Sequence, residues 1–454
     1  MKYKFTLYLC FFLSVCFFAV QFNAAAIDSA EASAHKLTLK RALAHAYTRN
    51  PNLEAARSEL RSIDENYIQA QAGFKPYITG NLGYTSNYSK RDFSNVKSDP
   101  KSASLELSQS LYSGGSTIAN VSEAQNKIKA GRANLKIKEQ EVFLSGVDTY
   151  MKFIRDKEIV SLSKSNEAVL SKHLKASKER YKLGDITKTA VSQAEARLAE
   201  AKANSIAAQG TLKKTKAEFE EIFGLSPLEL EKPKFDKKLP ATEIEALDIA
   251  KRNNPLIVFA RFSNKAAKDS IKSVEGENHP QVSLSGSVTK TYDPASISSD
   301  DTTSRAVGIS ATIPFYTGGD ISSRVREARH LENQKRMDIY SAERTVRKNV
   351  IAAWETLKSA EAESVARKAQ INSSKMALDG IKVETDFGSS STLDLLDAEQ
   401  EYLDAQVSYV SSETDKIVAT YSLLSSMGGL TAEGLNLSVD TYKPESNLQN
   451  TGNF

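Results

Sequence analysis

Two aspartates in the last quarter of the sequence are the residues best suited to act on charged solutes. Asp394 and Asp397 lie three positions apart, and in a helix this spacing puts both carboxylates on one face. Carboxylates so close together attract cations, and each raises the pKa of the other because like charges repel. A pair of aspartates on a helix is more often simply solvated, so the spacing alone leaves an ordinary surface role open.

No other pattern in the sequence indicates catalysis or a metal centre. The sequence lacks a glycine-rich phosphate loop, a nucleophile elbow and a metal-binding helix motif. The histidines are scattered without ligand spacing, which favours ordinary surface residues at His35, His45, His173, His279 and His330. We therefore expect no enzyme activity, no metal and no cofactor.

The first 26 residues are predicted to be a secretory signal peptide. Lys2 and Lys4 precede an apolar run over 7–20, and three alanines precede Ile27, the expected first residue of the mature chain. A membrane anchor is the alternative, but the run is short for a transmembrane helix, which needs about 20 apolar residues. Both cysteines lie in this run, so the mature chain would contain no disulfide. The net charge of +4 gives no indication of a nucleic-acid partner.

The remaining sequence is written twice with a constant shift of 204 residues. A long duplication without net insertion indicates two copies of one structural unit. We therefore predict a first repeat at 27–224, a linker at 225–244, a second repeat at 245–428 and a polar C-terminal tail at 429–454. The matching landmarks include Asn50-Pro51 with Asn254-Pro255, Tyr112 with Tyr316, Gly114-Gly115 with Gly318-Gly319, and Gly184 with Gly388.

Each repeat contains a long proline-free stretch that predicts a helical hairpin. Residues 116–182 and 321–385 are rich in helix-forming Ala, Lys, Glu, Arg and Gln, and each helix would be about 100 Å long. Such a length is typical of coiled-coil-like assemblies. Returning helices are predicted at 189–223 and 392–427. Apolar residues recur there every seven positions, as coiled-coil packing requires: Leu396, Leu403, Val410, Ile417 and Leu424.

Four segments alternate between apolar and small polar residues and predict strands at 77–88, 103–112, 281–292 and 305–315. Their length suits an outer-membrane strand, although a soluble antiparallel sheet with one buried face alternates in the same way. Polar loops are expected at 89–100 and 293–303. Four strands cannot close a barrel, and lipid does not tolerate an open sheet edge. Three chains, with twelve strands, would be the smallest assembly with an open lumen.

The order of these elements, the duplication, the two Gly-Gly strand exits and the run Leu393–Asp397 resemble the TolC family of outer-membrane channels over nearly all of the mature chain. The resemblance implies a mainly α protomer with four β-strands and long helical hairpins. It also implies a homotrimer with a 12-strand β-barrel in outer-membrane lipid and an α-helical barrel in the periplasm. The implied partners are a periplasmic adaptor protein and an inner-membrane pump of the RND or ABC type. The implied cargo is drugs, bile salts or secreted proteins.

The resemblance also assigns roles to particular residues. It places Asp394 and Asp397 at the periplasmic entrance, where threefold symmetry would form two stacked carboxylate rings. Family positions that lock the closed state carry Ser390, Thr385 and Ala190 here, so the lock would differ or be weaker. The hairpin tips become candidates for adaptor contact, although turn formation explains their glycines equally well: Leu183, Gly184, Asp185, Phe387, Gly388 and Ser389.

Two other protein classes share some of these features. A periplasmic coiled-coil adaptor or structural envelope protein also has long hairpins, but it does not need four strands of membrane length. A general diffusion porin has many more strands in each chain and little helix. The cargo, the pump and the adaptor cannot be named from the sequence.

Overall fold

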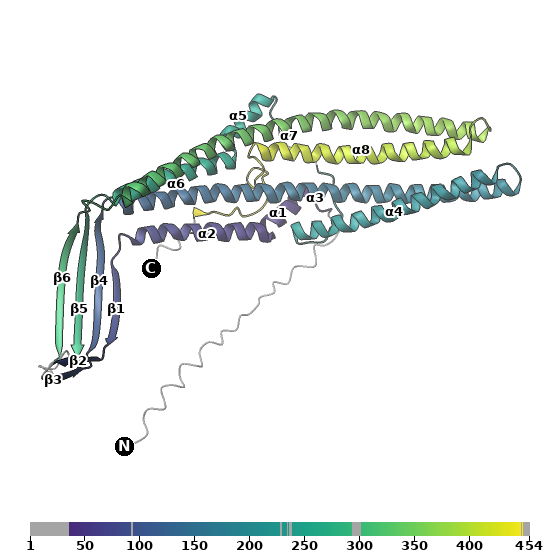
Figure 1. Ribbon diagram of the computed structural model, residues 1–454. Coiled ribbons are helices and arrows are strands. Elements are labelled where there is room, and N and C mark those ends of the chain that lie inside the picture. The colour runs from purple at the N-terminus through teal and green to yellow at the C-terminus, as the bar shows by residue number, and fades with distance from the viewer. Residues whose placement is uncertain are drawn as a thin grey trace, which may run out of the picture.

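The computed structural model describes residues 36–445 and 447, except 92–93, 228, 234, 236–237 and 293–300. The protein is a long bundle of helices with a β-sheet at one end and two hairpin tips at the other (Figure 1). The predicted signal peptide at 1–26 and most of the predicted loop at 293–303 lie outside the described residues.

Two sets of helices follow one another along the chain in the same order. Each helix of the second set begins 204 residues after its counterpart in the first set, so the fold is duplicated as the sequence is. The first set is α1 (Leu39–Arg49), α2 (Pro51–Ala72), α3 (Ser116–Lys182) and α4 (Lys188–Phe223). The second set is α5 (Glu243–Asn253), α6 (Pro255–Gly276), α7 (Asp320–Asp386) and α8 (Thr392–Ser426).

The corner between the first two helices of each set has the same construction. The Asn50 side chain accepts hydrogen bonds at the start of α2, and Pro51 occupies a first-turn position where its missing N–H is not needed. The same side chain donates to the Ile222 carbonyl oxygen at 2.9 Å. In the second set Asn254 donates to the Ser426 carbonyl oxygen at 2.8 Å. Each asparagine therefore joins a helix start to the end of the returning helix.

The two long helices, α3 and α7, have 67 residues each. They bury narrow apolar stripes against α4, α6 and α8 and expose charged residues elsewhere. Within the described residues, no helix combines the length and the apolar character that crossing a membrane requires.

One antiparallel sheet joins the two repeats. It consists of β1 (Tyr77–Tyr84), β4 (Lys101–Ser113), β5 (Gln281–Tyr292) and β6 (Thr302–Thr312), in the order β1-β4-β5-β6. The central pair, β4 and β5, takes one strand from each repeat. The outer strands β1 and β6 each have a free edge within the described part of one chain.

The pairing register collects apolar side chains on one face of this sheet. Ile78 lies opposite Leu107, and Leu284 lies opposite Ile309. Leu82 of β1 lies on the same face and is 89% exposed, so nothing in the described chain covers it. A large uncovered apolar surface indicates a contact with lipid or with another protein.

The predicted loop at 89–100 is wrong in part, because the chain forms a second hairpin there. Strands β2 (Asn87–Arg91) and β3 (Ser94–Ser98) pair in an antiparallel ladder that places Asn87 opposite Ser98. The hairpin lies at the end of the sheet farthest from the helices (Figure 1). A polar sequence can still form a ladder, since backbone N–H and C=O groups seek partners whatever the side chains are.

The predicted polar tail is also wrong over its first part. The chain returns to the helices after α8, and four residues beyond Gly429 are buried: Leu430, Ala432, Leu435 and Leu437. We call residues 430–445 the C-terminal segment. Its few apolar side chains form no regular pattern in this polar stretch, and they become buried only because the segment packs back on the main hydrophobic core.

The main hydrophobic core lies near the middle of the bundle. Phe143, Tyr150, Phe219 and Phe223 are at most 1% exposed there. The Tyr150 hydroxyl lies 2.6 Å from the carbonyl oxygen of Leu37 and 2.7 Å from that of Glu231, and burial raises the pKa of this phenol. The chain before α1 and the chain after α4 are therefore both joined to α3 at the level of this core.

Candidate functional site at the hairpin tips

The first hairpin tip joins α3 to α4 through Leu183, Gly184 and Asp185. Gly184 has a φ of +83°, a left-handed conformation that glycine adopts without steric cost. The N–H of Gly184 donates to the Tyr181 carbonyl oxygen, and that of Asp185 donates to the Arg180 carbonyl oxygen, both at 3.0 Å. These bonds satisfy carbonyl groups at the end of α3.

The second tip repeats this arrangement between α7 and α8. Gly388 has a φ of +76°. The N–H and the hydroxyl of Ser389 both donate to the Glu384 carbonyl oxygen at 2.9 Å. The Ser390 hydroxyl donates to the Glu384 carboxylate at 2.6 Å. Hydrogen bonds within the hairpin therefore determine the shape of this tip.

Each tip presents one large apolar side chain to solvent. Leu183 is 79% exposed and Phe387 is 84% exposed, and the two occupy equivalent positions in the two repeats. Single exposed apolar residues are common. Two at matched positions, each at the end of a rigid hairpin, form a surface that a partner protein can bury.

Asp394 lies in the first turn of α8 and forms a capping box with Ser391. Its carboxylate accepts from the Ser391 hydroxyl at 2.7 Å and from the Ser391 N–H at 2.8 Å, while its own N–H donates to the Ser391 hydroxyl oxygen at 3.2 Å. These hydrogen bonds lower the pKa of Asp394. The Ser391 hydroxyl contributes most, and the Ser391 N–H contributes less. In the single chain this direction is opposite to the increase expected from stacked carboxylate rings, because hydrogen bonds to the ionised form favour ionisation.

Asp397 contacts the other hairpin. Its Oδ1 accepts from Arg197 Nη2 of α4 at 2.5 Å, and Arg197 also lies 3.3 Å from Glu200. The arginine and aspartate side chains are 32% and 54% exposed, so solvent screens the pair and its contribution to stability is small. The pair nevertheless joins α4 to α8 close to the tips.

The lock positions named in the sequence analysis form contacts inside their own hairpins. The Thr385 hydroxyl donates to the Ile381 carbonyl oxygen at 2.7 Å, and Ser390 binds Glu384 as described above. The Ala190 N–H donates to the Thr187 hydroxyl oxygen at 3.3 Å, which caps α4.

A second contact between the hairpins was not predicted from the sequence. Glu399 of α8 is 6% exposed, and its Oε1 lies 3.0 Å from His173 Nε2 of α3 and 3.9 Å from Lys382 Nζ of α7. We expected an ordinary surface residue at His173, but the ring is partly buried against this carboxylate. The sequence signal was the position of Glu399, three residues after the buried Leu396, which puts a carboxylate on the packed side of the helix.

The site can act on ions and on partner surfaces. It contains exposed carboxylates, a guanidinium–carboxylate contact between hairpins and two exposed apolar tips. In the part of the chain that the structure describes, no cluster of three or more His, Cys, Asp or Glu side chains could hold a metal ion.

A sheet of outer-membrane strand length that continues into long paired helices and ends in hairpin tips defines the class of outer-membrane export channels. The chain belongs to the outer membrane efflux protein family, whose pattern matches residues 42–225 and 246–429. The two matched ranges coincide closely with the two structural repeats.

Individual relatives agree with this assignment. The outer membrane efflux protein BepC of Brucella suis is 31% identical over 412 residues, which cover 91% of this chain and 90% of BepC. The outer membrane protein TolC of Escherichia coli is 22% identical, over 85% of this chain and 81% of TolC. A solved membrane protein from Pseudomonas aeruginosa has the same fold, with a TM-score of 0.77 at 18% identity, over 88% of this chain and 92% of its own.

The comparisons confirm the predicted TolC-type fold, the outer-membrane location and the function as a channel of efflux and secretion systems. These relatives are channel proteins, which agrees with the expectation that the chain is not an enzyme.

Proposed function

We propose that three copies of this chain form a passive exit duct that receives cargo from an inner-membrane pump through a periplasmic adaptor. The observation that supports a trimer is the sheet, which has free edges at β1 and β6 and an uncovered apolar face. Lipid does not satisfy backbone groups, so both edges must pair with other copies. Three copies contribute twelve strands, enough for an open lumen.

Engineered disulfides between the two edge strands test this assembly. The only native cysteines, Cys10 and Cys16, lie within the predicted signal peptide, so introduced pairs can be followed without background. Thr79→Cys on β1 is combined in turn with cysteines at each position from 304 to 310 on β6. We expect at least one pair to give a covalent trimer on a non-reducing gel. A product that never exceeds one chain, or that stops at two, contradicts the closed ring.

The proposed cargo is small toxic compounds, since the relative that is 31% identical is named an efflux protein. A deletion strain should become more sensitive to detergents and drugs, and the wild-type gene should restore resistance. Normal resistance together with loss of secreted proteins from the medium would replace this proposal by protein secretion.

At the tips, the proposal assigns the adaptor contact to Leu183, Phe387 and the turn residues beside them, and the periplasmic constriction to Asp394 and Asp397. Exposed apolar side chains at both tips support the first assignment. The position of both carboxylates in the first turns of α8, beside the tip, supports the second. Replacing Leu183 and Phe387 by Asp should lower the recovery of the adaptor after cross-linking, while the amount of channel in the outer membrane stays unchanged.

A further inference from the structure

The internal duplication gives the protein two equivalent grooves. The first groove lies between α1, α2 and α3, and the second lies between α5, α6 and α7. Their lining residues correspond at the shift of 204: Tyr47 with Lys251, Leu53 with Ile257, Lys136 with Tyr340, and Glu139 with Glu343.

The chain fills the first groove with its own C-terminal segment. Figure 1 shows this segment, in yellow, returning from the end of α8 toward α1. The N–H of Ala432 donates to the Glu139 carboxylate at 2.5 Å, and the N–H of Tyr442 donates to the Tyr47 hydroxyl oxygen at 2.9 Å. Glu445 lies 3.4 Å from Arg132. The first groove therefore binds an irregular peptide through backbone hydrogen bonds, apolar contacts and an ion pair.

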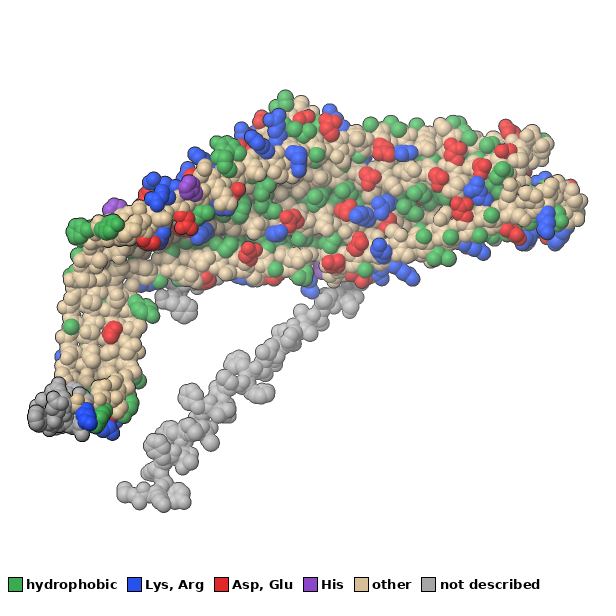
Figure 2. Space-filling model, in the orientation of Figure 1, with side chains coloured by type: hydrophobic (Ala, Val, Ile, Leu, Met, Phe, Trp, Pro, Cys, Tyr) green, Lys and Arg blue, Asp and Glu red, His purple; other side chains and the backbone are tan. Residues whose placement is uncertain are grey.

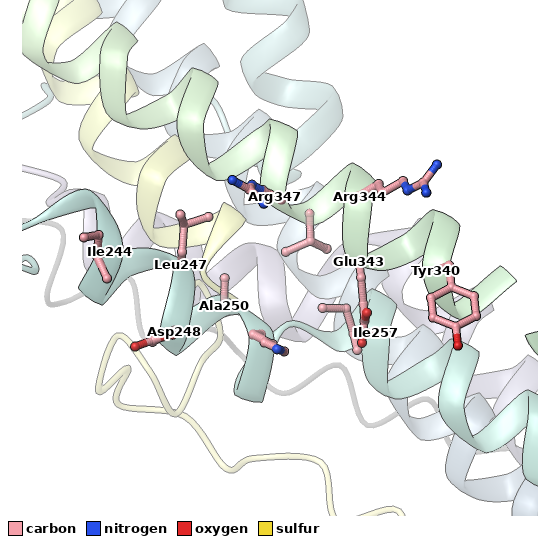
Figure 3. A pocket seen from close by; sticks show the side chains of 11 residues that line it. Ile244, Leu247, Asp248, Ala250, Ile257, Tyr340, Glu343, Arg344 and Arg347 are labelled. Carbon is pink, nitrogen blue, oxygen red and sulfur yellow. The ribbon is translucent and has the colours of Figure 1, made fainter. Parts of the chain in front are cut away.

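The second groove is open within the described part of the chain. It has a volume of about 450 Å³, and Figure 3 shows its lining side chains between α5, α6 and α7. Ala250 and Ile257 form a buried apolar floor, while Tyr340 at the rim is 54% exposed. Glu343, the counterpart of the peptide-binding Glu139, lies 3.2 Å from Arg261 instead of receiving a peptide N–H.

The second groove carries cations at three positions that are uncharged in the first repeat, and Asp248 adds one carboxylate to its lining. Lys251, Arg344 and Arg347 occupy the positions of Tyr47, Gln140 and Phe143. All three cations are exposed, and none of them has an ion-pair partner among the described residues. Figure 2 shows Lys and Arg side chains gathered where α5 meets α7. An apolar floor with unpaired cations at its rim is complementary to a peptide that carries both apolar and acidic side chains.

We propose that the second groove binds a peptide segment of a separate envelope protein, in which carboxylates stand beside apolar side chains. The C-terminal segment of each copy already occupies the first groove of that copy, so a second copy cannot offer this segment to the second groove. The site lies on the side of the bundle, remote from the hairpin tips (Figure 1). The inference therefore goes beyond the proposed export function and does not depend on it.

Peptide binding tests the chemistry of the groove. The probe is a fluorescent synthetic peptide with the sequence of residues 430–445, and it is titrated against the full chain in detergent. We expect saturable binding that weakens at least tenfold in the double variant Arg344→Glu and Arg347→Glu. The control variant, Lys368→Glu and Lys375→Glu, makes the same change of charge farther along α7 and should bind within twofold of wild type. No saturable binding, or equal binding by both variants, would overturn the proposal.

Photocross-linking in cells tests the occupant. Tyr340 is replaced by p-benzoylphenylalanine, and the cross-linked residues are identified by mass spectrometry. An adduct within an acidic and apolar segment of another polypeptide, lost in the Arg344→Glu and Arg347→Glu background but kept with Lys368→Glu and Lys375→Glu, supports the proposal. An adduct to another copy of this chain, an adduct that survives the charge reversal in the groove, or the absence of any adduct would refute it.

Discussion

Asp394 and Asp397 stand one helical turn apart but make different contacts in the protomer. Asp394 binds back to Ser391 at the start of its own helix, and Asp397 reaches across to Arg197 of the other hairpin. Hydrogen bonds to its charged form lower the pKa of Asp394 and favour its ionised state. Both side chains lie on the solvent-exposed start of α8, where the proposed constriction would use them to attract cations.

Neutralising both aspartates should reduce the preference of the channel for cations. The variant is Asp394→Asn with Asp397→Asn, and the expected result is a several-fold fall in the cation-to-anion permeability ratio. The measurement is the reversal potential of single channels in a planar bilayer under a salt gradient. Glu327→Gln with Asp338→Asn, on α7 away from the tips, removes the same charge and should leave the ratio unchanged. Equal selectivity in both variants would argue against the carboxylate rings.

The capping box predicts a dependence on pH at the start of α8. The pKa of Asp394 is lower in the folded protein than in the unfolded chain, so its ionised form stabilises the cap above the ordinary aspartate pKa of about 3.9. This stabilisation is lost as the pH falls through the lowered pKa. Ser391→Ala removes both side-chain contacts of the cap and should make the first-turn amides exchange about fivefold faster at neutral pH.

Hydrogen exchange between pH 3 and pH 6, corrected for intrinsic rates, measures this effect. Thr187→Ala is the matched control, because Thr187 caps α4 but Ala190 takes the place of the carboxylate. In the control variant, amide exchange at the start of α4 should become faster by the same factor at every pH. If the corrected exchange rate at the start of α8 did not increase as the pH falls, Asp394 would have no part in the cap.

The junction between sheet and helix depends on close backbone packing. Gly114 has a φ of +65°, and a Cβ placed there would lie 2.0 Å from the Gly276 carbonyl oxygen. The neighbouring Gly115 has a φ of +91°, but a Cβ there would meet nothing within 4 Å. The first glycine is therefore required by contact as well as by conformation, and the second by conformation alone.

Gly114→Ala should prevent correct assembly, while Gly115→Ala should be tolerated. A left-handed alanine costs about 1 kcal/mol, whereas the contact with Gly276 cannot be relieved without separating β4 from α6. We expect the amount of protein in the outer membrane to fall at least fivefold for Gly114→Ala and less than twofold for Gly115→Ala. Similar amounts of the two variants in the outer membrane would show that the contact between Gly114 and Gly276 does not limit assembly.

Across the whole molecule, the C-terminal segment links the end of the second repeat to the first repeat. Leu430, Leu435 and Leu437 are at most 8% exposed, and the segment also forms the hydrogen bonds to Glu139 and Tyr47. Burial raises the pKa of Glu139, and the N–H of Ala432 partly offsets this by binding the carboxylate. The segment thus belongs to the core of the protomer.

Removing this segment should destabilise the protein. Burial of each leucine contributes roughly 1.5–3 kcal/mol, so a chain that ends at Gly429 should melt at least about 5 °C lower than wild type. A chain that ends at Asn447 keeps the described contacts of the segment, including the hydrogen bond from Asn447 to the Tyr442 hydroxyl, and should melt at the wild-type temperature. Equal melting of the two truncated chains would contradict a structural role.

Prediction from the sequence succeeds where the structure depends on local pattern. The helices over 116–182 and 392–427 were recognised from composition and seven-residue spacing, and the structure places α3 at Ser116–Lys182 and α8 at Thr392–Ser426. The contacts of Asp397 and Glu399 were missed. Their partners Arg197 and His173 lie 200 and 226 residues away, and only the packing of one hairpin on the other brings them together.

The duplication, the long hairpins, the alternating strands and the tip glycines follow from the sequence by itself, because each depends on residues that are neighbours in the chain or on one constant shift. Tertiary structure alone decided the strand order, the burial of the C-terminal segment and the difference between the two grooves. Each of these depends on which surfaces meet. The same groove is filled in one repeat and open in the other because the chain has only one C-terminal segment to place.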